Sequence, residues 1–185
     1  MSTALDERVN ALQSRVLGAG PSMPSDVGAL FGQIRKYLLD AADEERLKSR
    51  PDTILKLLKK DREGKGPGTA EILGGSADFK RSNDKPAFER DDGARFDFAI
   101  TLRQGKSGLE LIAYHFEIRF HCGCPGFVRF DLNQPGHNNE DKGLRAHLHP
   151  GHDDLQVPAP MMSPMEVLDV LVYGLRRTEG RKARS

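Results

Sequence analysis

The stretch RFDFAITLRQGKSGLELIAYHFEIRFH, residues 95–121, decides the fold of this chain. In its first part the apolar residues alternate with polar ones, at Phe96, Phe98, Ile100 and Leu102. Alternation with a period of two is typical of a strand with one buried face. Residues 104–108 interrupt the pattern with two glycines and predict a hairpin loop. The remainder predicts a long partner strand over 109–121, with apolar side chains at the even positions from Ile112 to Phe120.

The flanking sequence adds strands after this hairpin and helices on both sides of it. We expect further strands over 127–132 and 144–149, because apolar and polar residues alternate there too. The sequence Ser163-Pro-Met-Glu166 has the form of a capping box and predicts a C-terminal helix. Before residue 63 the apolar spacing is helical. We therefore predict an α+β fold, an antiparallel meander of four to five strands packed against N-terminal helices and one C-terminal helix.

Composition divides the chain into four parts. Residues 1–63 are predicted to be helical, with a first stripe at Leu5, Val9, Leu12 and Val16 and with Ser25 expected to cap the second helix. Residues 64–76 are rich in glycine and are interpreted as a linker. Residues 77–178 are expected to hold the sheet and the C-terminal helix, and residues 179–185 a basic tail.

The bulk numbers limit the function classes. The 185 residues carry a formal net charge of +1, so no global positive field indicates nucleic-acid binding. No apolar run reaches the roughly 18–20 residues of a membrane helix, and no secretory signal precedes the first helix. The two cysteines, Cys122 and Cys124, are too close together for an ordinary loop-closing disulfide. We expect a cytoplasmic protein without a membrane partner.

The histidines are the strongest functional signal, since all six lie between His115 and His152. The predicted strand parity places several of them on the polar face of the sheet with arginines and acids. That face carries His115, Glu117, Arg119, Arg129, Asp131, Arg145, His147 and His149. One interpretation is an ordinary exposed sheet face with cross-strand ion pairs. The other is a functional site, because arginine and histidine outnumber the lysine, threonine and serine of a merely hydrated face.

The residue types at this face suit RNA cleavage without a metal. His147 and His149 are the acid and base candidates, with His115 as a third. Asp131 or Glu117 would orient an imidazole. The expected phosphate-binding residues are Arg119, Arg129 and Arg145. No cofactor is required for this chemistry.

Zinc is the alternative cofactor. Its expected ligands are Cys122, Cys124, His147, His149 and His152. The close pair of cysteines lacks the two-knuckle spacing of most structural zinc sites.

Three short motifs resemble the TumE-like toxin family of prokaryotic toxin–antitoxin and defence loci. They are Arg129-Phe-Asp131, Arg145-Ala-His-Leu-His149 and Ser163-Pro-Met-Glu-Val-Leu168, within the region 114–175. The resemblance implies a toxin that acts on RNA, with Asp131, His147 and His149 in the functional region and an antitoxin as partner. The long helical N-terminus departs from the pattern of that family.

Three hypotheses about function follow from the sequence. The first is a small toxin or phage-defence effector that acts on RNA through the polar sheet face. The second is a non-enzymatic binding or regulatory subunit of a defence complex, whose polar face binds a protein partner or a nucleotide. The third is a zinc-stabilised domain.

Overall fold

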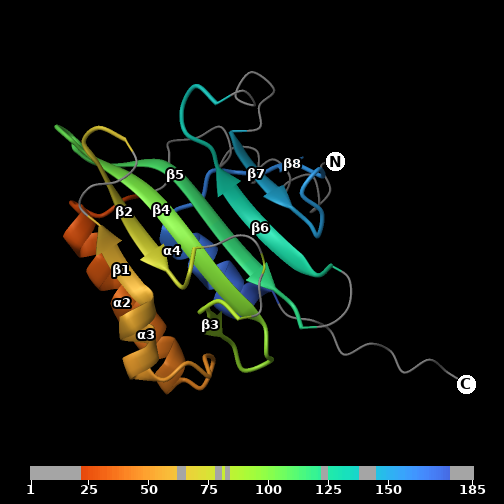
Figure 1. The fold of residues 1–185 in the computed structure, drawn as a ribbon. Helices are drawn as coiled ribbons and strands as arrows, with labels where there is room; N and C mark the ends of the chain where they lie inside the picture. Colours follow the sequence, from red (N-terminus) through yellow and green to blue (C-terminus); the bar gives the residue numbers. More distant parts are fainter. Residues whose placement is uncertain are drawn as a thin grey trace, which may run out of the picture.

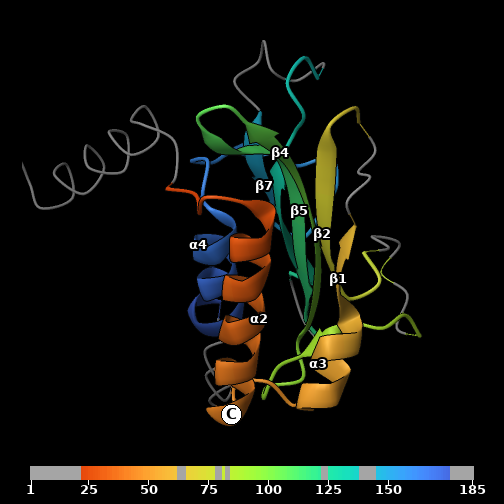
Figure 2. The ribbon, with the colours of Figure 1, turned by 90° about the vertical axis from the view of Figure 1, so that its left-hand side faces the viewer.

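The chain forms one antiparallel sheet with helices against one of its faces (Figure 1; Figure 2). The computed structural model describes residues 22–61, 66–77, 81, 84–121, 125–137 and 145–175. The predicted α+β class is confirmed. The predicted first helix and the basic tail lie outside the described residues. Within them, no helix is both long and apolar enough to cross a membrane.

The helices and strands have the following bounds. The helices are α2 (Val27–Asp43), α3 (Pro51–Leu57) and α4 (Pro164–Asp169), which continues as the π-helical turn η1 (Val170–Gly174). The strands are β1 (Leu58–Asp61), β2 (Thr69–Gly74), β3 (Phe88–Glu89), β4 (Arg95–Gly105), β5 (Gly108–Arg119), β6 (Phe127–Leu132), β7 (Ala146–His149) and β8 (Val157–Pro158). Their order across the sheet is β1-β2-β4-β5-β6-β7-β8, and β3 pairs with β4.

The hairpin of β4 and β5 forms the centre of the sheet, as its sequence predicts. Phe98, Ile100 and Phe116 are fully buried in the core that the sheet shares with α2 and α4. One detail differs, because the register shifts between Thr101 and Leu102. As a result Leu102 pairs with Leu111, and Leu111 rather than Ile112 packs against this core. A bulge reverses the parity of every residue beyond it.

Of the two predicted helix N-caps, one agrees with the structure and one does not. The capping box at the start of α4 is confirmed, since the Ser163 hydroxyl accepts from the backbone of Glu166 and the Glu166 carboxylate accepts from that of Ser163. The predicted cap of α2 is wrong by one residue. Asp26, rather than Ser25, accepts a hydrogen bond from the backbone of Ala29.

The predicted boundary between residues 63 and 64 lies outside the described residues, but the character expected on either side of it differs from the structure. The third helix ends at Leu57, and the chain continues as strand β1, which was expected to remain helical. Residues 69–74 of the predicted linker form strand β2, which pairs with both β1 and β4. Among the described residues the sheet therefore has eight strands, where the sequence predicted four to five. The exposed lysines of β1 are typical of an edge strand, which is stabilised by its neighbour more than by its own sequence.

The pKa values of the three tyrosines are raised in the folded protein. Burial raises the pKa of Tyr114 to about 12, against the opposing hydrogen bond from the Met162 backbone. Burial and the Glu44 carboxylate raise the pKa of Tyr173 to about 12, and burial with the Asp169 carboxylate raises that of Tyr37 further. These folded-state pKa values exceed the tyrosine pKa of about 10 in an unfolded chain. The contribution of the protonated phenols to folding stability is therefore complete below about pH 10 and is lost as the pH rises through the folded-state values.

We expect the native protein to show little tyrosinate absorbance at about pH 11, where the denatured protein is mostly ionised. A spectrophotometric titration with and without guanidinium measures this difference. Coincident titration curves in the two solvents would show that the phenols are not protected by the fold.

Candidate functional site

The strand register assembles the predicted polar face. Asp131 in β6 lies between two histidines, since it pairs with His115 in β5 on one side and with His147 in β7 on the other. In the next row Arg129 lies between Glu117 and His149. Side chains of paired residues point to the same face of a sheet. Residues from three separate segments of the chain are thus brought together.

This face is not a hydrated sheet surface. Five of its ionisable side chains belong to buried residues, namely Asp97, Glu117, Asp131, His147 and His149, each at most 3% exposed. Burying such groups is costly unless they are paired with one another or hold an ion. The expectation of an exposed face is therefore wrong for these five residues, whereas the cross-strand ion pairs that belong to the same interpretation are present.

His115 and Asp131 form an oriented pair. The Nδ1 atom of His115 lies 2.7 Å from Oδ1 of Asp131, and the imidazole is 46% exposed while the carboxylate is 4% exposed. Burial would raise the pKa of Asp131, but the hydrogen bond and charge of His115, together with Arg129, hold it below its ordinary value. An ionised Asp131 accepts Nδ1–H and leaves the His115 lone pair on Nε2, the form that a general base requires.

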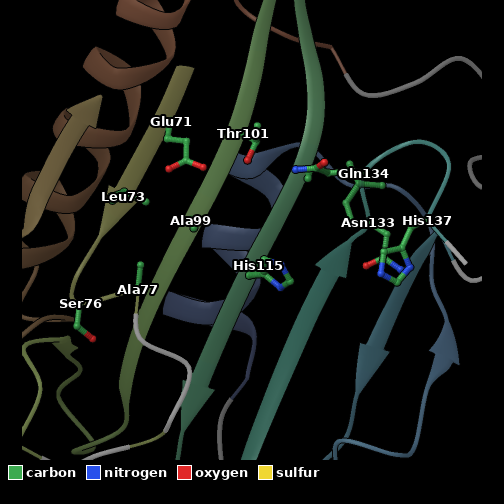
Figure 3. A pocket seen from close by; sticks show the side chains of 12 residues that line it. Glu71, Leu73, Ser76, Ala77, Ala99, Thr101, His115, Asn133, Gln134 and His137 are labelled. Carbon is green, nitrogen blue, oxygen red and sulfur yellow. The ribbon is translucent and has the colours of Figure 1, made fainter. Parts of the chain in front are cut away.

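His115 borders a cavity of about 540 Å³ on the face of the sheet opposite the helices (Figure 3). The cavity is of the size that holds small ligands. His137, from the loop after β6, lines the same cavity, as do Thr101, Asn133 and Gln134. From the sequence His137 is expected in a loop, where it is at most one of several possible zinc donors. Only the path of the chain after β6 brings it to the cavity that His115 lines.

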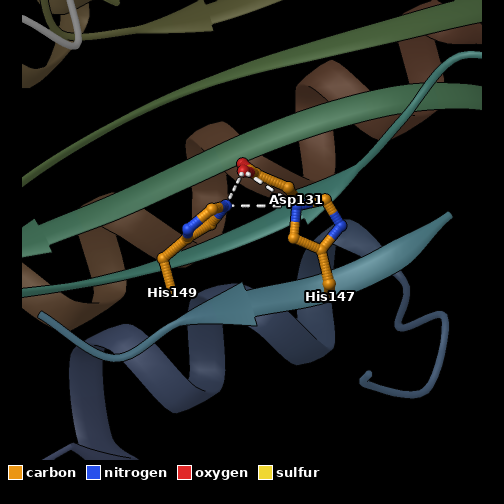
Figure 4. A group of neighbouring side chains, drawn as sticks. All are labelled: Asp131, His147 and His149. Atoms are coloured by element: carbon orange, nitrogen blue, oxygen red, sulfur yellow. Dashed lines mark hydrogen bonds and ion pairs between the residues drawn. The ribbon is translucent and has the colours of Figure 1, made fainter. Parts of the chain in front are cut away.

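His147 and His149 lie away from this cavity in a buried cluster with Asp131 (Figure 4). Their Nε2 atoms are 3.1 Å apart. Oδ2 of Asp131 lies 3.2 Å from Nε2 of His149 and 3.6 Å from that of His147. Because both imidazoles are buried, they are poorly placed to meet a substrate. The roles of acid and base that the sequence assigned to them fit His115 better.

The three arginines expected to bind phosphate are engaged by the protein itself. Arg119 forms an ion pair of 3.1 Å with Asp97. Arg129 contacts Asp131 at 2.8 Å and Asp153 at 2.7 Å. Arg145 donates to the backbone oxygen of Asn133 over 3.4 Å. In the described part of the chain none of these arginines lines the cavity. Their geometry favours structural ion pairs over substrate binding.

Arg81, which the sequence did not single out, contacts the polar face. Arg81 donates to Glu117 at 3.0 Å and to both carboxylate oxygens of Asp153, and its guanidinium lies 3.5 Å from the centre of the Phe127 ring. The expectation that Glu117 orients an imidazole is therefore wrong, because its partners are Arg81 and Arg129. No local pattern marked these contacts, since they join segments far apart in the sequence.

The zinc ligands predicted from the sequence do not all meet. His152 is exposed, and its imidazole lies 3.8 Å from the Asp154 carboxylate, outside the buried cluster. Cys122 and Cys124 lie outside the described residues. The described donors that converge are Asp131, His147 and His149.

The sequence matches no protein-family model, and no curated protein or solved structure matches it either. The resemblance to the TumE-like toxins stays a prediction based on the three short motifs.

Proposed function

We propose that this protein is a ribonuclease-type enzyme whose His115 acts as the general base. The observation that carries this proposal is the half-exposed imidazole of His115, which is held by the buried carboxylate of Asp131 at the edge of a cavity. A base oriented by a buried carboxylate is the arrangement that activates a hydroxyl group in many hydrolytic enzymes.

A second imidazole at the same cavity supplies the acid. In the proposed reaction Nε2 of His115 removes the proton from a ribose 2′-hydroxyl, whose oxygen then forms a bond to phosphorus. The bond from phosphorus to the 5′-oxygen breaks, and protonated His137 donates a proton to that leaving oxygen. The products are a 2′,3′-cyclic phosphate and a free 5′-hydroxyl. No metal takes part at the reacting atoms.

Neutral donors at the cavity wall replace the arginines in binding phosphate. Asn133 and Gln134 line the wall near His137, and Nδ2 of Asn133 has no hydrogen-bond partner among the described residues. This donor is buried and unsatisfied, so an acceptor that reaches it, such as a phosphoryl oxygen, would be favoured. The hydroxyl of Thr101 is a further donor on the opposite side.

The test is cleavage of labelled single-stranded RNA by the purified protein. We expect His115→Ala to reduce the rate by about 10²–10⁴-fold, the usual range for loss of a general base. His121→Ala is the matched control. This histidine lies just after β5, the strand that carries His115, but it is exposed and does not line the cavity. RNA with a 2′-deoxy sugar at the cleaved position should be inert. Equal rates for wild type and His115→Ala would overturn the proposal.

The resemblance to TumE-like toxins supports a biological setting for this activity. We propose that the protein acts in the cytoplasm as a toxin or phage-defence effector and is inhibited by an antitoxin. Expression in a bacterial host should then arrest growth, and His115→Ala should relieve the arrest. RNA that is bound without being cleaved would instead favour the non-enzymatic binding subunit.

A further inference from the structure

We propose that Asp131, His147 and His149 bind one divalent transition-metal ion, with zinc as the best fit. The proposal does not depend on RNA cleavage. It assigns a role to the two histidines that the proposed reaction leaves unused, and it replaces the cysteine-based ligand set predicted from the sequence.

The spacing of the three donor atoms matches the size of such an ion. The distances between Nε2 of His147, Nε2 of His149 and Oδ2 of Asp131 are 3.1, 3.2 and 3.6 Å. A circle through three atoms at these separations has a radius of about 1.9 Å, slightly less than the zinc–ligand distances of about 2.0–2.2 Å. An ion bonded to all three would therefore lie just outside their plane and keep its remaining positions on the other side.

The chemistry of the donors points to the same class of ion. Two imidazole nitrogens and one carboxylate oxygen are borderline ligands that bind zinc and ferrous iron, whereas calcium and magnesium prefer oxygen alone. All three residues are buried, so an ion here would be largely shielded from water. The Nε2 atom of His149 faces both other donor atoms, while its Nδ1 has no hydrogen-bond partner among the described residues.

The surrounding charges are also suited to a cation. Three carboxyl groups, from Glu117, Asp131 and Asp153, face the two guanidinium groups of Arg81 and Arg129. With all three carboxyl groups ionised, these five side chains carry a formal charge of −1. Arg129 donates through Nε to the proposed ligand atom Oδ2 of Asp131 at 2.8 Å, and Asp153 at 2.7 Å offsets part of its positive charge.

The sheet holds the ligands rigidly. Asp131 and His147 are direct cross-strand partners, and His149 lies two residues further on the same face of β7. An ion on Oδ2 would leave Oδ1 bonded to His115, so the metal would also help to hold the carboxylate that orients the proposed base.

The experiment is a calorimetric titration of Zn²⁺ into the full-length protein after treatment with EDTA and dialysis. We expect one ion per chain and a rise in the Tm when zinc is present. His149→Ala and His147→Ala should weaken binding by more than about 100-fold, since loss of even an outer-shell partner costs 10–100-fold. Circular dichroism without metal shows whether each variant folds. His149→Gln is the second variant should alanine fail to fold, and it should lose binding likewise.

Two control variants separate this site from the alternatives. His152→Ala should bind zinc as the wild type does, because His152 is exposed and lies outside the cluster. Cys122→Ser/Cys124→Ser should also retain binding. The proposal is overturned by wild-type protein that binds no stoichiometric zinc, by unchanged affinity in His147→Ala/His149→Ala, or by loss of the site in the cysteine variant. Because no RNA is present, failure here is distinct from failure of the cleavage assay.

Discussion

Arg90→Ala should lower the free energy of unfolding by about 2–5 kcal/mol, the usual range when a large buried side chain is truncated to alanine. Arg90 is fully buried at the junction between the sheet and the C-terminal helix. Its guanidinium donates to the backbone oxygen of Leu171 at 2.5 Å and to the Asp92 carboxylate at 3.1 Å through Nε. The alanine variant leaves the carbonyl in η1 without this donor, leaves the carboxylate unpaired and opens a cavity.

The loss would be a large share of the 5–15 kcal/mol that stabilises a typical domain. Arg46→Ala is the matched control, since its ion pair with Asp91 is 3.7 Å long and its side chain is 42% exposed. Exposed pairs of this kind contribute about 0–1 kcal/mol. Urea unfolding of both variants measures the difference. Similar midpoints for Arg90→Ala and Arg46→Ala would contradict a structural role for the buried guanidinium.

Asp131→Asn should reduce RNA cleavage by about 10²–10⁴-fold, although Asp131 does not line the cavity itself. Its carboxylate fixes the tautomer of His115 through the 2.7 Å hydrogen bond to Nδ1. The amide of asparagine carries no charge to stabilise the imidazolium that forms during the reaction. We expect the effect to appear in kcat more than in KM, because the interaction strengthens only as the proton moves.

A double-mutant cycle distinguishes this positioning role from a structural one. If Asp131 acts through His115, Asp131→Asn should have little further effect on cleavage in a His115→Ala background. A residue that merely supports the fold would lower the rate by the same factor in both backgrounds. Circular dichroism and zinc titration of each variant show whether the ion proposed at Oδ2 also changes. Additive effects in the cycle would contradict the proposed pairing of His115 with Asp131.

Much of the fold could be predicted because local patterns agree with tertiary packing. The alternation in β4 and β5 and the capping box of α4 each leave a signature in consecutive residues. The strands β1 and β2 could not be predicted in this way. Their sequences are short, lysine- and glycine-containing segments, and pairing with β4 determines their conformation.

The candidate site shows the same division. Strand parity correctly placed His115, Asp131 and His147 on one face, because parity depends only on sequence spacing. It did not indicate which imidazole is exposed. The burial of His147 and His149 is a property of the tertiary structure that strand parity does not record.

The sequence by itself determined the α+β class, the central hairpin and the set of polar residues that share a sheet face. Only the tertiary structure decided that Asp131 lies between His115 on one side and His147 and His149 on the other. It also decided that His137 and His115 line the same cavity. The physical reason is the sequence separation over which each kind of interaction acts. A repeating pattern records which way a side chain points, whereas strand order, burial and the pairing of charges depend on which distant segments become neighbours.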